Sequence, residues 1–268
     1  MPLQIETAVL HSTGGRANNE DAWGEMACDG TACWVVCDGA GGHGGGDVAS
    51  RLAVQHSLVC WRDKIGCAAS APAPPRVRPP LPDQDADALH EAVIAADRAV
   101  HDGQRQGAAV ADMRTTIAML ALDLNKRHAA WAHVGDTRVY RFRSGRLCEQ
   151  TRDHSLVEQL RQAGLAQGDA SREHPRRNVL TAALGGGYAD ESAETAAMAE
   201  PLQAGDAFLL CTDGFWEYVF EDEMAAELAG LPAAAQVLAR LEDRLRARAR
   251  SGHDNYTAVL IELREAAA

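Results

Sequence analysis

The chain has 268 residues, of which 46% are hydrophobic and 24% are charged, as in soluble globular proteins with a substantial core. Its formal net charge of −12 at pH 7 argues against general nucleic-acid binding, which needs a basic surface. It contains neither an apolar run long enough to cross a bilayer nor a signal peptide at its start, so we expect a cytoplasmic protein with no membrane segment.

The cysteine content carries its own prediction. There are seven cysteines, an odd number, and none forms a C-x-x-C pair. This pattern favours reduced, buried thiols over disulfides or a zinc site. It therefore also favours a reducing compartment.

Hydrophobic patterning in the first part of the chain predicts three strands followed by two helices. A proline-rich loop with six prolines in fifteen residues is expected between the helices, at 68–82. The expected elements are strands at 3–10, from 20 onward and at 34–37, and helices at 49–62 and 85–106.

The second part begins with consecutive strands at 117–124, 128–134 and 137–142. Such a meander differs from the alternating strands and helices of a parallel sheet. A helix at 155–163 follows, for which either Asp153 or Ser155 is a candidate N-cap. The remaining expectations are a polar flap at about 164–187, strands at 208–211 and 257–263, and helices at 222–229 and 232–250.

The glycine-rich stretch after the strand at 34–37 supports two interpretations. Gly39, Gly41 and Gly44 form G-x-G-x-x-G, the pattern of a dinucleotide-binding turn. Against this, the charge of Asp38 would oppose a pyrophosphate, and no acidic residue closes a second strand about 20 residues later. The alternative is a metal-binding turn, in which a carboxylate ends a buried strand and glycines let backbone carbonyls approach a cation.

The rest of the chain supplies further carboxylates of the same kind. An aspartate lies beside a tight-turn residue, at the border of an apolar strand, in Asp38-Gly39, Gly135-Asp136, Asp213-Gly214 and Asp254-Asn255. Each alone is most simply a turn or a helix cap. Together with Glu20-Asp21, they are better explained by carboxylates that converge on hard cations such as Mg²⁺ or Mn²⁺.

Six motifs resemble those of type 2C protein phosphatases, the metal-dependent PPM family. They occur in the family's order, and the glycine-rich form at 38–43 resembles that of bacterial members. The motifs are Arg16-Ala-Asn-Asn-Glu-Asp-Ala22, Val36-Cys-Asp-Gly-Ala-Gly-Gly-His43, Val134-Gly-Asp-Thr-Arg-Val-Tyr140, Thr151-Arg-Asp-His-Ser155, Leu210-Cys-Thr-Asp-Gly214 and Asp254-Asn-Tyr-Thr257.

The resemblance implies a single α+β domain over residues 1–268, a four-layer α/β/β/α sandwich of two packed antiparallel sheets. It also implies two bound Mn²⁺ or Mg²⁺ ions and a third, weaker site. Arg16 would grip the substrate phosphate, and His43 is a candidate general acid. The implied metal ligands are Glu20, Asp21, Asp38, the Gly39 carbonyl, Asp136, Asp213 and Asp254.

The implied activity is hydrolysis of phosphoserine and phosphothreonine in proteins by a water that the two-metal centre activates. A cognate serine/threonine kinase would supply the phosphorylated protein, and we expect a monomer. The alternative is a catalytically weak phosphoprotein-binding domain of the same fold. A lost metal ligand would indicate that alternative, and none is lost.

Overall fold

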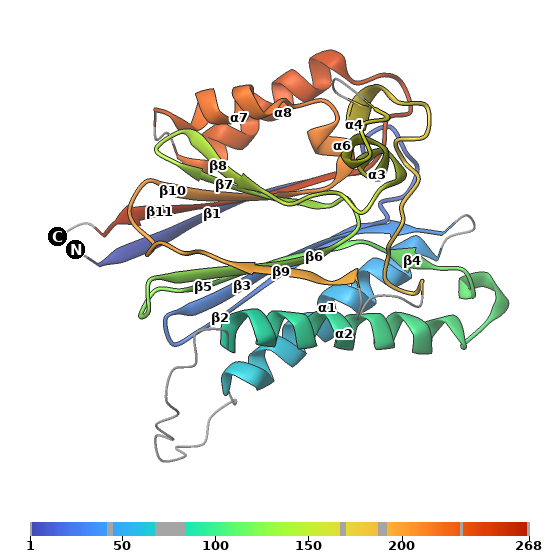
Figure 1. Cartoon of the computed structure of the whole chain (residues 1–268), viewed down its shortest axis with the longest axis horizontal. Helices are drawn as coiled ribbons and strands as arrows, with labels where there is room; N and C mark the ends of the chain where they lie inside the picture. The colour runs from blue at the N-terminus through green and yellow to red at the C-terminus, as the bar shows by residue number, and fades with distance from the viewer. Residues whose placement is uncertain are drawn as a thin grey trace.

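Two antiparallel sheets lie face to face in the computed structural model of the protein (Figure 1), which describes residues 2–41, 45–67, 84–166, 170–186, 192–230 and 233–266. The first sheet has the strand order β1 (Leu3–Ser12), β11 (Tyr256–Glu265), β10 (Asp206–Cys211), β7 (Arg138–Arg143) and β8 (Arg146–Gln150). The second has the order β2 (Asp21–Cys28), β3 (Thr31–Ala40), β5 (Ile117–Asp123), β6 (His128–Val134) and β9 (Glu194–Ala197), and β4 (Arg114–Thr115) also pairs with β3.

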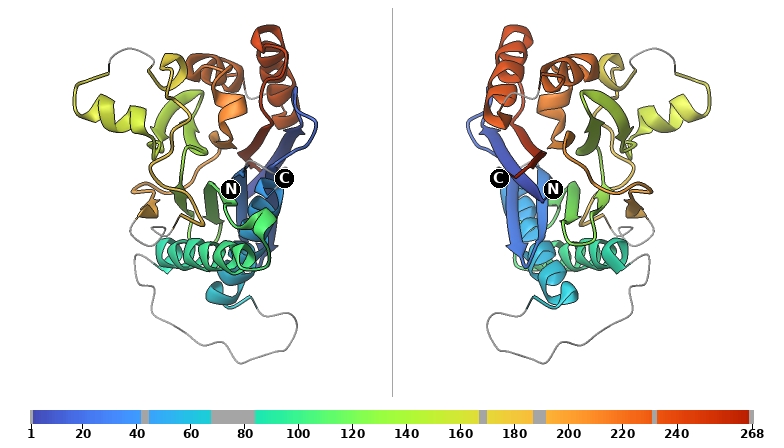
Figure 2. Two further views of the ribbon diagram at one scale, coloured as in Figure 1. Left: turned by 90° about the vertical axis from the view of Figure 1, so that its right-hand side faces the viewer. Right: turned by 90° about the vertical axis from the view of Figure 1, so that its left-hand side faces the viewer.

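Helices cover the outer face of each sheet, as both views of Figure 2 show. The second sheet is covered by α1 (Gly46–Ile65) and α2 (Gln84–Gln104), and the first by α7 (Glu221–Leu228) and α8 (Ala234–Arg248). Three short helices lie near one end of the sandwich: α3 (Leu156–Gln162), α4 (Ala170–Glu173) and α6 (Asp213–Trp216). The predicted four-layer α+β sandwich is confirmed.

The alternation of side chains along the strands builds three apolar layers. In β3, Cys33 and Val35 face α1 and α2, whereas Trp34 and Val36 pack between the two sheets. In β11, Leu260 faces α8 and its neighbour Ile261 points into the layer between the sheets. Both strands are therefore apolar on both faces, which explains their continuous hydrophobic runs.

Several elements differ from the sequence-based expectations. Ser155 is the N-cap of α3, since its hydroxyl accepts a hydrogen bond from the Glu158 N–H, and Asp153 instead forms an ion pair with Arg138. The patterning missed the short strands β4, β8 and β9. The predicted loop at 68–82 lies outside the described residues, as do parts of the predicted flap. None of the described helices has the length and apolar character that a membrane span requires.

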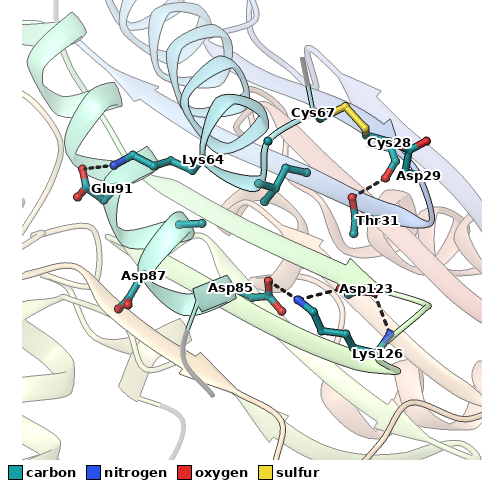
Figure 3. Close-up of a pocket in the computed structure, with 13 residues that line it drawn as sticks. Cys28, Asp29, Thr31, Lys64, Cys67, Asp85, Asp87, Glu91, Asp123 and Lys126 are labelled. Carbon is teal, nitrogen blue, oxygen red and sulfur yellow. Dashed lines mark hydrogen bonds and ion pairs between the residues drawn. A yellow bond between two sulfur atoms is a disulfide. The ribbon is translucent and has the colours of Figure 1, made fainter. Parts of the chain in front are cut away.

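The expectation of reduced cysteines was wrong for one pair, because Cys28 and Cys67 form a disulfide (Figure 3). Cys28 ends β2 and Cys67 follows α1, and the packing of α1 on β2 brings their Cα atoms to 6.3 Å. The two are 39 residues apart, so no local motif reveals the pairing. Cys33, Cys37 and Cys211 are free, buried thiols as predicted. Cysteine content therefore gives no support to the predicted cytoplasmic location.

Candidate metal centre

Strands β2 and β3 place two of the predicted ligands side by side. Asp21 and Asp38 are direct partners in the antiparallel register, so their side chains project from the same face of the sheet. Asp21 is 6% exposed, and its Oδ2 accepts hydrogen bonds from the hydroxyls of Thr212 (2.9 Å) and Thr257 (2.7 Å). Its Oδ1 is also buried and has no hydrogen-bond partner among the described residues.

The main chain of Asp38 is fixed by two threonines that end β4 and precede β5. The Asp38 N–H donates to the Thr116 hydroxyl at 2.9 Å. The Asp38 carbonyl accepts from the Thr115 hydroxyl and from the Thr116 N–H, both at 2.8 Å. With its backbone bonded in this way, Asp38 holds its carboxyl near the end of β3, an interior strand of the sheet.

Gly39 lies where only a glycine fits. A Cβ at this position would be 2.1 Å from the Gly46 carbonyl oxygen and 2.6 Å from the Glu20 carbonyl oxygen. The Gly39 N–H donates to that Glu20 carbonyl at 3.1 Å. The glycine therefore brings three segments together: the end of β3, the start of α1 and the loop before β2. This close approach accounts for Gly39 without a nucleotide.

Asp213 and Asp136 approach the same centre from the first sheet and from the β6–β7 turn. Asp213 begins α6 after the N-cap Thr212, and its charge adds to the upward pKa shift of Asp38. The Oδ1 of Asp213 is buried without a partner among the described residues. Asp136 is 6% exposed, and its carbonyl accepts a hydrogen bond from the Trp216 indole at 2.9 Å.

Asp254 and Glu20 complete the set at its solvent-facing side. The Asn255 side-chain carbonyl accepts from the Glu20 N–H at 2.8 Å, and its amide donates to two carbonyls of the loop before β2, those of Thr13 and Asn18. Asn255 thus connects the loop before β2, which carries Glu20, to the segment before β11, which carries Asp254. Arg16 forms an ion pair with Asp254 at 3.0 Å, with 56% of its own side chain exposed.

The carboxyls repel one another, and burial adds to this effect. Burial and the charges of Asp213 and Asp254 raise the pKa of Asp21 to about 7, despite its two threonine hydrogen bonds. Burial, with Glu217 and Asp254, raises the pKa of Asp213 to about 7 as well. Burial raises the pKa of Asp38 well above its usual range, and the charges of Asp21 and Asp213 add to the shift. Such a cluster is stable as anions only beside positive charge.

The donor set fits divalent cations that prefer oxygen ligands. It consists of carboxylates, two of which have a buried oxygen with no hydrogen-bond donor among the described residues. Hard cations such as Mn²⁺ and Mg²⁺ accept this kind of ligand and supply the missing charge. The structure therefore brings together Glu20, Asp21, Asp38, Gly39, Asp136, Asp213 and Asp254.

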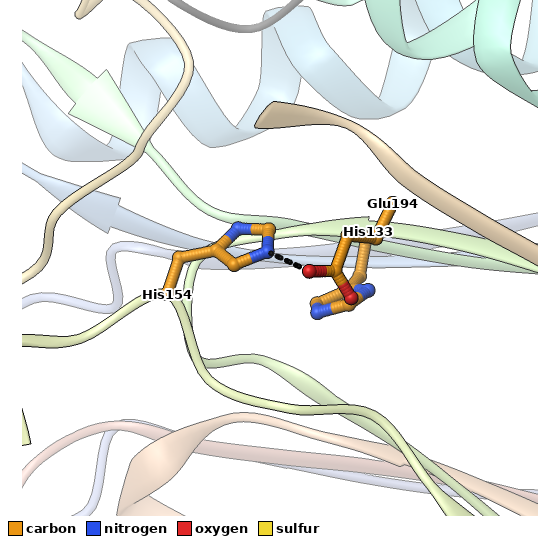
Figure 4. A group of neighbouring side chains, drawn as sticks. All are labelled: His133, His154 and Glu194. Carbon is orange, nitrogen blue, oxygen red and sulfur yellow. Dashed lines mark ion pairs between the residues drawn. The ribbon is translucent and has the colours of Figure 1, made fainter. Parts of the chain in front are cut away.

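A second group of possible ligand atoms belongs to His133, His154 and Glu194, within 4.8 Å of one another (Figure 4). His154 Nδ1 accepts a hydrogen bond from the Gly135 N–H at 3.1 Å, so in the neutral ring Nε2 carries the proton and faces Glu194 at 3.4 Å. His133 stacks on His154 and donates from Nε2 to the Arg152 carbonyl at 2.7 Å. These bonds hold segment 152–154 against the turn that carries Asp136.

Sequence reasoning missed the residues that position the carboxylates. Thr212 and Thr257 lie within motifs that were singled out, which is the signal that could have found them. Thr115 and Thr116 directly precede the strand expected at 117–124 and belong to none of these motifs. The candidate general acid His43 lies outside the described residues.

The comparison with known families decides the identity. The sequence profile of the family described as protein phosphatase 2C matches residues 11–255. The chain belongs to the protein phosphatase 2C family. It is therefore a phosphoprotein phosphatase by class, with the metal dependence that is typical of this family.

Relatives of this phosphatase are found in several bacteria. The serine/threonine phosphatase Stp of Listeria welshimeri is 30% identical over 250 residues, which cover 92% of this chain and 91% of Stp. The crystal structure of the Mycobacterium tuberculosis serine/threonine phosphatase PstP matches with a TM-score of 0.76 and 28% identity, covering 99% of this chain and 100% of that one. A structure of the PstP catalytic domain in complex with two manganese ions matches with a TM-score of 0.73 and 25% identity, covering 98% and 100%.

Proposed function

We propose that this protein phosphatase hydrolyses phosphoserine and phosphothreonine in proteins. The observation that carries the proposal is the convergence of carboxylates from both sheets around Asp38, with buried oxygens for which the described part of the chain supplies no donor. The metal dependence of the family and the names of its relatives support the same activity.

The carboxylates would hold two Mn²⁺ or Mg²⁺ ions. Asp38 is central, since Asp21 is its cross-strand partner and the charge of Asp213 acts on its carboxyl. We propose Glu20, Asp21 and the Gly39 carbonyl as ligands on one side of Asp38, and Asp213 and Asp254 on the other. Asp136 would contribute to a third, weaker site. When bound, the ions would lower the pKa of a water and neutralise charge on the phosphoryl oxygens.

Arg16 would bind the substrate phosphate. Its guanidinium is partly exposed and forms an ion pair with Asp254 at 3.0 Å. A cation held by Asp254 would neutralise that carboxylate, and the Arg16 guanidinium would then be available to bind two phosphate oxygens at once. His43 remains a predicted general acid.

The cellular setting is also a proposal. A serine/threonine kinase of the same cell would form the phosphoproteins that this enzyme hydrolyses. We propose that the enzyme acts as a monomer in the cytoplasm.

The test is hydrolysis of a phosphothreonine peptide with Mn²⁺, by the wild type and by Asp38→Asn. We expect turnover that stops when a chelator is added and that is reduced by at least about 100-fold in the variant. Activity that survives both the chelator and the substitution would overturn the proposal. Tight peptide binding without turnover at saturating Mn²⁺ would instead favour the phosphoprotein-binding alternative.

A further inference from the structure

A groove leads away from the carboxylate centre toward α4. Its inner part is a cavity of about 190 Å³ that includes Asp213, Asp254 and Arg16 in its lining. Its outer part is a cavity of about 430 Å³ that extends to Arg172 and Glu173. Both parts are lined by the same four residues and thus form one path: Arg177, Glu217, Tyr218 and Arg250.

Two of the arginines in this groove are already neutralised. Arg177 forms an ion pair with Glu217 at 2.6 Å. Arg172 forms an ion pair with Glu221 at 3.0 Å and donates to the Trp216 carbonyl at 2.9 Å. These pairs shape the wall of the groove and fix α4 against the end of α6.

Arg250 differs from both. Arg250 is exposed, and its guanidinium forms no hydrogen bond or ion pair within the described parts of the chain. Its backbone carbonyl accepts hydrogen bonds from the His253 N–H (3.1 Å) and from Nδ1 of the same histidine (3.0 Å). The backbone is thus fixed four residues before Asp254, and the charged group is left free at the groove. In a chain of net charge −12, an uncompensated guanidinium beside the active centre favours an anionic ligand there.

A phosphoprotein segment that lies along this groove would bring its phosphate to Arg16 and Asp254. Its neighbouring residues, spaced about 3.3–3.6 Å apart in an extended segment, would then lie beside Tyr218 and Arg250. The half-buried ring of Tyr218 lines both parts of the groove and gives this segment a flat surface on which to lie.

We infer that Arg250 selects phosphoprotein substrates that carry an acidic side chain within a few residues of the phosphoserine or phosphothreonine. The inference rests on the proposed phosphatase activity and adds a sequence preference to it. Arg250 acts on substrate affinity and takes no part in the reaction at phosphorus.

The test compares peptides that differ only in the residues beside one phosphothreonine, which are either Glu or Lys. We expect the wild type to show a kcat/KM about tenfold higher for the Glu peptides, mainly through KM, and this ratio to shrink as ionic strength rises. Arg250→Gln should bring the ratio close to one, and Arg250→Glu should reverse it.

A matched control is Arg62→Glu, which makes the same charge change near the far end of α1. This variant should keep both the wild-type ratio and the wild-type activity. A wild type that hydrolyses p-nitrophenyl phosphate with Mn²⁺ but treats both peptides alike would overturn the inference and leave the proposed function standing. A preference that persists in Arg250→Glu would also overturn it. If no substrate is hydrolysed at all, the proposed function fails and the inference fails with it.

Discussion

Asp21 and Asp38 are direct cross-strand partners on β2 and β3, and the hydroxyls of Thr212 and Thr257 reach Asp21 from the other sheet. Two carboxyls that face each other in this way destabilise the fold unless cations neutralise them. The repulsion between the Asp21 and Asp38 carboxyls lowers the stability of the fold, and such destabilising groups are typical of functional sites.

Asp38→Asn should therefore stabilise the metal-free protein while abolishing activity. The amide keeps the shape of the side chain but removes a charge from the cluster, which we expect to add about 1–2 kcal/mol to the free energy of unfolding. Thermal unfolding in chelator, with the exposed Asp87→Asn as control, measures this directly. A lower melting temperature for Asp38→Asn than for the wild type would count against a repulsive cluster.

Thr257→Val should weaken metal activation. The hydroxyl of Thr257 donates to Asp21 at 2.7 Å, and its loss leaves a buried carboxyl with one hydrogen bond fewer. We expect a loss of about 1–3 kcal/mol in stability and a higher Mn²⁺ concentration for half-maximal activity. Thr257→Ser restores the hydroxyl and should behave like the wild type in both measurements. Equal Mn²⁺ requirements for the Val and Ser variants would show that the hydroxyl is not needed.

Gly39→Ala should be inactive and strongly destabilised. The added methyl group would lie 2.1 Å from the Gly46 carbonyl oxygen, so α1 would have to move away from β3. The matched control is Gly107→Ala, where nothing lies within 4 Å of the added carbon and the extended backbone (φ 167°) suits any residue. Circular dichroism melts and phosphatase assays on both variants test this. Wild-type behaviour of Gly39→Ala would mean that the two segments are not packed as described.

The ion pairs between α7 and α8 should make stability fall in acid. Hydrogen bonds from Arg248 lower the pKa of Glu223 from 4.5 to about 2, and Arg244 adds to the shift. A depressed carboxyl pKa stabilises the fold above the unfolded pKa, and this contribution is lost as the pH falls from about 4.5 to about 2. For these partly exposed pairs we expect roughly 1 kcal/mol.

Urea unfolding at about pH 6 and about pH 3 checks this contribution. Glu223→Gln should be less stable than the wild type at the higher pH, and the difference should shrink at the lower one. The exposed Asp243→Asn on α8 serves as the control. A constant difference at both pH values would assign the effect to packing and not to charge.

The sequence was most informative where a carboxylate ends or borders an apolar run. Asp38 and Asp213 are of this kind, and the order of the motifs was enough to predict the four layers. The hydrogen-bond donors to Asp21 could not be predicted from the sequence. Thr212 and Thr257 are 191 and 236 residues away along the chain, and they contact Asp21 only because the two sheets pack together.

The burial of charged residues inside the sandwich was also not predicted from the sequence. Arg138 is 3% exposed, a burial that hydrophobic patterning does not predict. It is stabilised by Asp153 at 2.8 Å and by the Trp216 ring, 3.5 Å below its guanidinium carbon. Both partners come from other elements of the fold. The Cys28–Cys67 disulfide escaped prediction for the same reason, since tertiary packing alone brings the two residues together.

In the proposed metal centre, Asp38 would lie between two divalent cations. An anomalous difference map from crystals grown with Mn²⁺, measured near the manganese absorption edge, tests it most directly. We predict two peaks about 3.5–4 Å apart, both in contact with the Asp38 carboxyl. A map with no peak at Asp38, or with manganese only beside His133, His154 and Glu194, would contradict the account.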